Sequence, residues 1–271
     1  MLSLAVFAIY VCGALWLLAA VWRTDPQRAA GHGRLVTGLT TATLGVLLHA
    51  YLLWGALLGG QDLALNTNEA ASLVGWIIAL ISLWTTWQRP RFAALAGVLL
   101  LCVGVTAAFT DDASRNFVAS QSGWQLAAHI VIAIVAYALI ALGAVIALAL
   151  SALDRRLRRH QPLRALGKLP SMEALESAMF QTIYVGFALL TLTLFSGFIF
   201  VQDLVAQHLT HKVALSCVAW LILGILLIGR WRLGWRGRIA ARWTLGGFVL
   251  LGLAYFGSKF VLEVILGRHW G

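Results

Sequence analysis

The chain has 271 residues, of which 61% are hydrophobic and only 11% are charged. Soluble domains have roughly 45–50% apolar and about 25% charged residues, so this composition excludes a water-soluble domain. The net charge of +10 does not indicate nucleic-acid binding, because the basic residues are spread between apolar runs; membrane lipids are the expected partner.

The apolar residues fall in runs of about twenty, enough for a helix to cross ~30 Å of hydrocarbon. Strands would leave backbone groups unpaired in lipid. We therefore predict an all-α, polytopic bundle of about eight transmembrane helices, forming a single domain over residues 1–271. The predicted spans are about Leu2–Trp22, Leu35–Leu58, Ala70–Trp87, Phe92–Phe109, Trp124–Leu150, one after Ser171 reaching Val201, Lys212–Ile228 and Trp243–Leu266.

Local signals mark several ends of these spans. Pro26 follows the first span and prevents the helix from continuing. That span has neither a preceding basic segment nor an Ala-x-Ala site after it, which predicts a retained helix and not a signal peptide. Ser171 is the expected N-cap of the sixth helix, with Glu173 and Glu176 in its first turn.

The distribution of Lys and Arg predicts the orientation. Sixteen of the twenty lie in alternate loops, within 23–34, 89–91, 155–168 and 230–242. The positive-inside rule makes these loops cytoplasmic and places both termini on the outer, periplasmic side. Contact with anionic lipid is a secondary use of the same charge.

The three cysteines, Cys12, Cys102 and Cys217, all lie inside predicted spans and form no CxxC pair. Neither a disulfide framework nor thiol exchange is therefore expected. We interpret them as small apolar packing residues.

Five of the seven histidines fall in the predicted outward half of the protein; the other two, His32 and His160, lie in cytoplasmic loops. His129 lies about one and a half turns into the fifth span, and His269 lies just beyond the eighth. Two neutral imidazoles from different helices are suitable axial ligands for haem iron. Without a family resemblance, a hydrogen-bonded structural or loop histidine is the stronger interpretation of each, since their spacing alone decides nothing.

The remaining outward histidines have several interpretations. His49, deeper in the second span, could be another haem ligand, a proton-relay group or a buried residue bonded to a backbone carbonyl. His208 and His211 are three apart and could share a helix face, but no further ligands complete a metal site. In the last span, Lys259 and Glu263 have the spacing of an ion pair. No catalytic motif is present, so no conventional enzyme active site is expected.

Three stretches of the chain resemble the cytochrome c assembly family that includes CcsA, CcmC and the HemX-like proteins, with the HemX-like branch most similar. The first runs from Trp124 through His129 to the Ala-Tyr-Ala step at 136–138. The second contains Lys212, Trp220 and the basic exit at 230–238. The third runs from Gly246-Gly-Phe248 to the tail at 267–271, and 68–73 resembles an Asn-Leu-Tyr-Glu-Ser-Leu loop of the family.

The resemblance implies an inner-membrane protein of cytochrome c biogenesis that binds or handles haem near the periplasmic face. It assigns His129 and His269 as the axial ligands and leaves His49 and His211 as further candidate cofactor contacts. Other cytochrome c assembly or inner-membrane proteins are the expected protein partners.

The chain also departs from the family pattern. The family's Trp-rich haem-presenting motif is absent at 200–211, and Ile228 stands where CcsA-type synthases carry a histidine. Haem ligation to an apocytochrome is therefore not expected, and an accessory role is predicted. The alternative is a haem-free membrane scaffold or regulator of a neighbouring membrane protein.

Overall fold

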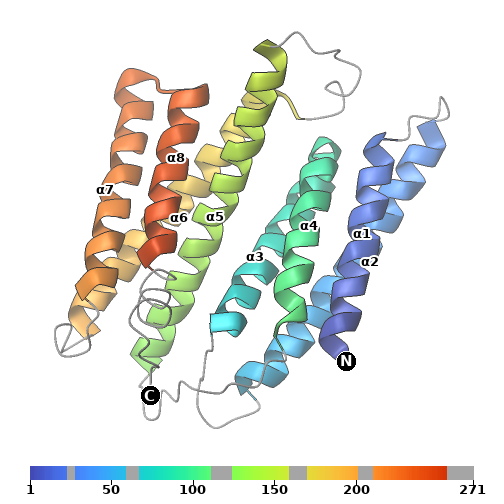
Figure 1. The fold of residues 1–271 in the computed structure, drawn as a ribbon, viewed down its shortest axis with the longest axis horizontal. Helices are drawn as coiled ribbons and strands as arrows, with labels where there is room; N and C mark the ends of the chain where they lie inside the picture. The colour runs from blue at the N-terminus through green and yellow to red at the C-terminus, as the bar shows by residue number, and fades with distance from the viewer. Residues whose placement is uncertain (23–27, 59–66, 111–123, 159–169, 201–209, 255–271) are drawn as a thin grey trace, which may run out of the picture. The chain divides into compact units, whose positions relative to one another are not determined.

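A computed structural model describes residues 1–22, 28–58, 67–110, 124–158, 170–200 and 210–254. Every regular element in these ranges is helical, which confirms the predicted all-α class (Figure 1). In chain order the elements are α1 (Leu2–Trp22), α2 (Arg28–Leu58), α3 (Thr67–Gln88), the short 3-10 helix η1 (Pro90–Phe92), α4 (Ala93–Ala108), α5 (Trp124–Arg158), α6 (Met172–Phe200), α7 (Thr210–Leu233) and α8 (Gly237–Gly252).

The chain divides into two compact units, each described here by itself. Unit 1 contains α1 to α4 and unit 2 contains α5 to α8, drawn from blue to green and from yellow-green to red in Figure 1. In unit 1, α1 packs against both α2 and α4, and α3 packs against α4. In unit 2, α5 packs along α6 and against α8, which also packs against α7. The predicted single domain over 1–271 stays a prediction.

Seven helical segments of the described residues, from α1 to α7 with η1 and α4 counted together, are long and apolar enough to cross a membrane. The eighth predicted span, Trp243–Leu266, is described only in its first part, which belongs to α8. Large apolar side chains on the surface, such as Leu47 and Phe195, are 63% and 66% exposed. An apolar exterior of this kind requires lipid as its surroundings, so the polytopic membrane bundle is confirmed.

Several helices are longer than their predicted spans at the basic ends. α2 begins at Arg28 instead of near Leu35, and α5 continues past Leu150 to Arg158. Past Leu150, no proline interrupts the chain before Arg158, and Asp154 pairs with Arg158 one turn later at 3.1 Å. Hydrophobicity predicts only the part of a helix that lies in lipid, whereas the helix itself continues into the charged boundary region.

Glycines allow close approach of helix pairs inside each unit. A Cβ at Gly38 of α2 would lie 2.8 Å from the Leu17 side chain of α1. A Cβ at Gly186 of α6 would lie 2.9 Å from the Ile140 side chain of α5. Small residues at such crossings are the usual means by which membrane helices pack tightly.

The basic end of unit 2 is held by Glu176 of α6. Its carboxylate accepts a hydrogen bond from Arg230 Nη1 of α7 at 2.7 Å and another from the Gly237 backbone N–H at 3.0 Å. Gly237 is the first residue of α8, so this carboxylate also satisfies a free amide at the helix N-terminus. Gly234 and Gly237 have φ values of 65° and 55°, which only glycine adopts readily in the tight turn between α7 and α8.

The predicted cap of α6 is confirmed. The Ser171 hydroxyl accepts a hydrogen bond from the Ala174 backbone N–H at 3.2 Å, which is the expected N-cap geometry. Glu173 lies in the first turn of the helix. Glu176, predicted for the same turn, instead anchors α7 and α8 as described above.

The three cysteines are free, as predicted. Cys12 and Cys102 are exposed, however, so the prediction that they are packing residues is wrong for these two. A thiol behaves as a small apolar group, and it is therefore compatible with a lipid-facing position as well as with a core.

Candidate functional site

His129 lies at the end of unit 2 that is opposite its arginine-rich end. It is the sixth residue of α5, a helix whose last turn carries Arg155, Arg156 and Arg158. Its half-buried side chain meets Ser196, which lies close to the end of α6. Because α5 and α6 pack along each other, this pair sits where the two helices approach the membrane boundary.

Ser196 links the His129 ring to the backbone of α6. Ser196 Oγ lies 2.8 Å from Nδ1 of His129 and 3.1 Å from the Thr193 carbonyl oxygen. The arrangement that satisfies both contacts has Nδ1–H donating to Ser196 Oγ and the lone pair on Nε2.

That lone pair is accessible. Nε2 of His129 has no hydrogen-bond partner within the described parts of the chain. No buried polar side-chain atom among the same residues lacks a partner, which places Nε2 among the atoms that are open to their surroundings. Metal-binding histidines commonly bind through one nitrogen while the other donates to an oxygen, and His129 has this arrangement.

The surroundings of the ring suit a flat, apolar ligand. A Cβ at Gly197 would lie 3.3 Å from Cε1 of His129, so the glycine leaves room for the imidazole edge. Phe195, Phe198 and Ile199, within one turn of Ser196, are 66%, 59% and 54% exposed.

His49 has a different environment in unit 1. It belongs to α2 and its side chain is fully buried, with 0% exposure. Its Nδ1 lies 3.2 Å from the Tyr10 hydroxyl of α1, and its Nε2 lies 2.7 Å from Ser72 Oγ of α3. Ser72 Oγ lies 2.7 Å from Thr110 Oγ1, just past the end of α4. Of the three interpretations of His49, the structure shows a buried, hydrogen-bonded residue, but the partners of its ring are side-chain hydroxyls and not a backbone carbonyl.

This chain of hydroxyls also has a direction. The Tyr10 hydroxyl donates to Nδ1 of His49, and Nε2–H of the ring donates to Ser72 Oγ. The reverse direction would leave the hydroxyl hydrogen of the buried Tyr10 without an acceptor, at a cost of about 1–3 kcal/mol. Both nitrogens of His49 are therefore occupied, and an iron ligand role would require it to release Tyr10 or Ser72.

The other predicted site residues are described only in part. His211 lies in the first turn of α7 next to Lys212, but its side chain is outside the described residues. His269, the predicted second ligand, is also outside them, as are His208 and the expected Lys259–Glu263 pair. Among the residues that the structure does describe, no group of three metal-ligating side chains occurs.

The described parts of the three family-like stretches come together within unit 2. Tyr137 of α5 packs against Phe248 of α8 with ring centroids 5.9 Å apart. A Cβ at Gly247 of α8 would lie 2.7 Å from Leu223 of α7, so α7 and α8 are in close contact there. Trp220 of α7 stacks on an α6 ring and donates from Nε1 to the Thr191 hydroxyl at 2.8 Å. Segments far apart in sequence thus pack together in one helical bundle.

Sequence reasoning missed the partners of both histidines. Ser196, Tyr10 and Thr110 were not singled out, although Ser72 belongs to the stretch that resembles the Asn-Leu-Tyr-Glu-Ser-Leu loop. The available signal was a hydroxyl inside an otherwise apolar span. That signal is weak, because most such hydroxyls here bond to their own helix backbone, as Thr86 does to Ser82.

The described fold defines the class: a multi-pass helical membrane protein with histidines placed inside its spans. The family model described as Cytochrome C assembly protein matches residues 41–266. The chain therefore belongs to the cytochrome c assembly family, and the match extends across both units.

Three relatives illustrate the family. The chain is 30% identical over 247 residues to "Inner membrane protein YpjD" of Escherichia coli K12, covering 88% of this chain and 90% of that protein. It is 28% identical over 294 residues to "Cytochrome c biogenesis protein CcsA" of Synechococcus sp. CC9311, covering 94% and 93%. An uncharacterized 28.8 kDa protein of Azospirillum brasilense is 29% identical over 246 residues, covering 90% and 89%.

No solved structure gives a significant match. The seven apolar spans and the relatives named above identify the chain as a multi-pass protein of the bacterial inner membrane. The orientation of its termini stays a prediction from the distribution of basic residues.

Proposed function

We propose that this protein is an inner-membrane accessory of cytochrome c biogenesis that binds or handles haem, with His129 and His269 as axial ligands near the periplasmic face. The observation that carries the proposal is the environment of the His129 ring. Its Nδ1 is bonded to Ser196 Oγ, and its Nε2 has no partner among the described residues, at the end of unit 2 opposite the arginines. The name of the Synechococcus relative, a cytochrome c biogenesis protein, supports the same assignment.

Each described residue has a separate task in this proposal. His129 supplies the nitrogen ligand, and Ser196 orients the ring and holds the hydrogen on Nδ1. Gly197 leaves space at the ring edge. Haem, when bound, supplies an iron centre whose two axial positions accept imidazole nitrogens. The proposal includes no catalytic step by the protein itself, and contacts of His49 and His211 with the cofactor stay predictions.

A spectrum of the purified protein tests this function. The full chain is purified in mild detergent from haem-supplied cells, and the wild type is expected to show a Soret band. His129→Ala and His269→Ala together should remove it, since both axial ligands are lost. His32→Ala is the matched control, because His32 is an exposed residue in a predicted cytoplasmic segment, and it should keep the band.

The alternative is a haem-free scaffold or regulator of a neighbouring membrane protein. The absence of tryptophan at 200–211, where the family carries its haem-presenting motif, favours it. Under this alternative the wild type lacks a Soret band, and the double histidine variant still associates with the same inner-membrane partners. A haem-dependent role requires that the wild type shows a Soret band and that the double histidine variant loses its association with these partners.

A further inference from the structure

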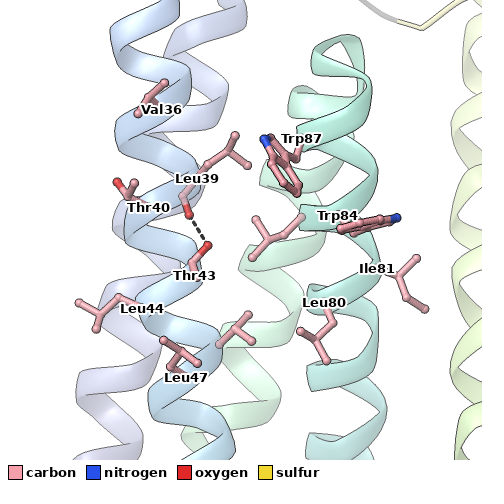
Figure 2. A pocket seen from close by; sticks show the side chains of 12 residues that line it. Val36, Leu39, Thr40, Thr43, Leu44, Leu47, Leu80, Ile81, Trp84 and Trp87 are labelled. Atoms are coloured by element: carbon pink, nitrogen blue, oxygen red, sulfur yellow. Dashed lines mark hydrogen bonds between the residues drawn. The ribbon is translucent and has the colours of Figure 1, made fainter.

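Unit 1 contains an open groove between α2 and α3, with a volume of about 870 Å³. Figure 2 shows its walls: Val36 and Trp87 lie near one end, and Leu47 and Leu80 lie toward the other. Its size falls in the range of about 300–1,000 Å³ that is usual for sites of small ligands.

The chemistry of the groove is apolar. Of its twelve lining residues only Thr40 and Thr43 have a side-chain hydroxyl. Both donate to their own helix, Thr40 to the Thr37 carbonyl at 3.0 Å and Thr43 to the Leu39 carbonyl at 2.8 Å. The two threonine hydroxyls therefore need no polar partner from a ligand. A hydrocarbon occupant leaves neither of them without a hydrogen bond.

The lining residues supply no ligand for haem iron. None of the twelve is His, Cys, Met or Tyr, the side chains that ligate haem iron. The groove is thus chemically separate from the His129 site, and a ligand bound there is a property independent of the proposed haem function.

One end of the groove has an interfacial character. Trp84 and Trp87 form an edge-to-face pair with ring centroids 5.6 Å apart, and they are 58% and 69% exposed. Trp87 is two residues before Arg89, in the segment that leads into η1. Tryptophans at this position in a membrane helix commonly lie at the level of the lipid headgroups.

Two cations lie just beyond these tryptophans. Arg89 and Arg91 are both exposed, and neither forms an ion pair with any residue that the structure describes. The backbone holds them in a tight turn, since the Phe92 N–H donates to the Arg89 carbonyl at 2.9 Å. An apolar groove next to a pair of guanidinium groups is complementary in charge and polarity to a phospholipid with an anionic headgroup.

We propose that this groove binds an acyl chain of an anionic phospholipid, with the lipid phosphate held by Arg89 and Arg91. The acyl chain lies along α2 and α3, and the glycerol region lies against Trp84 and Trp87. The occupant fills the space that the diverging helices leave in unit 1, and it holds the two helices in register at their arginine-bearing ends.

Native mass spectrometry of the purified full chain tests this site. The protein is delipidated in detergent and then incubated with mixed micelles of phosphatidylglycerol and phosphatidylethanolamine. The wild type is expected to retain phosphatidylglycerol preferentially. Thr43→Trp places a large side chain in the groove and should reduce retention about tenfold, which corresponds to ~1.4 kcal/mol. Val105→Phe is the control, because Val105 is 49% exposed on α4 and does not line the groove.

A second set of variants tests the assignment of the lipid headgroup to Arg89 and Arg91. Arg89→Gln and Arg91→Gln should each lower the preference for phosphatidylglycerol over phosphatidylethanolamine about fivefold, since each basic residue contributes roughly 1 kcal/mol near an anionic lipid. Leu80→Trp, which fills the groove from the opposite wall, replaces Thr43→Trp if that variant does not fold.

The proposal is overturned if the wild type retains no lipid, or if a groove-filling variant and Val105→Phe retain equal amounts. Equal retention of the two lipids by the wild type overturns the role of the arginines. Because none of these measurements involves the Soret band, their failure is distinguishable from a failure of the haem proposal.

Discussion

The two units place a histidine inside a membrane bundle in two contrasting ways. In unit 1, His49 is fully buried and uses both ring nitrogens, one toward Tyr10 and one toward Ser72. In unit 2, His129 is half-buried and uses only Nδ1, toward Ser196. Both histidines therefore link helices, but only His129 keeps a ring nitrogen without a partner among the described residues.

The contrast depends on whether the second ring nitrogen has a partner. The His129 ring is bonded through Nδ1 to Ser196 Oγ, and Nε2 has no partner among the described residues. The His49 ring is bonded at both nitrogens, to the Tyr10 hydroxyl and to Ser72 Oγ. Serine partners thus do not by themselves distinguish a ligand from a structural residue; the presence of a second partner does.

The strongest test of this comparison is the pair of alanine variants. His49→Ala should lower the free energy of unfolding by about 3 kcal/mol, from the cavity and the lost interhelical hydrogen bonds. It should leave the Soret band in place. His129→Ala should remove or strongly weaken that band with a much smaller loss of stability. Unfolding in mixed detergent micelles and absorbance spectra measure the two effects.

If His49→Ala also abolishes haem binding while the protein remains folded, the distinction between a structural His49 and a haem-binding His129 is wrong. His49 would then have released its hydroxyl partners to contact the cofactor. If His129→Ala destabilises the protein as much as His49→Ala, the ring at 129 is a structural cross-link after all.

Ser196→Ala tests the orientation of His129. The variant removes the acceptor of Nδ1–H, so the ring loses its fixed tautomer and direction. Haem affinity should fall about tenfold, within the range known for outer-shell partners of metal-binding histidines. Titration of the apoprotein with haem measures the change, and Ser72→Ala in unit 1 is the matched control. Equal affinity in Ser196→Ala and the wild type would show that the serine does not orient the ligand.

Tyr10→Phe tests the hydrogen bonds around His49. The phenylalanine keeps the aromatic packing but removes the hydroxyl that donates to His49 Nδ1. The free energy of unfolding should fall by about 1 kcal/mol, because hydrogen bonds between membrane helices contribute about 0.6 kcal/mol on average and up to about 1.7 kcal/mol. Thermal unfolding in detergent measures it. No loss of stability would show that the bond at 3.2 Å contributes little.

Gly197→Ala should have the smallest effect. The added methyl group would lie 3.3 Å from Cε1 of His129, so the ring must shift by a few tenths of an ångström. We expect a small shift of the Soret maximum with unchanged protein stability. Gly246→Ala is the control, since a Cβ there meets nothing within 4 Å. Identical spectra for both variants would mean that haem does not approach this edge of the ring.

Much of the fold follows from local sequence. The apolar runs predict α1 to α7 at nearly the observed positions, and Ser171 predicts the start of α6. The extensions at the start of α2 and at the end of α5 were missed, because both carry arginines and hydrophobicity predicts only the lipid-buried part of a helix. The exposure of Cys12 was missed as well, since a thiol is compatible with both a lipid-facing and a buried position.

The candidate site was predictable only in part. His129 was found from its place in its span and from a family resemblance, while the significance of Ser196 depends on a contact across 67 residues of sequence. The groove between α2 and α3 left no pattern in the sequence, because a concave apolar surface has the same composition as a convex one.

By itself the amino-acid sequence determined that this protein is a helical membrane protein with its positive charges in alternate loops. Those properties depend on the free energy of transferring single segments into lipid, which each segment carries alone. Only the tertiary structure decided which histidine keeps a free nitrogen and which is closed between two hydroxyls. A tautomer is set by the neighbours that packing supplies, and these come from other helices far away in the chain.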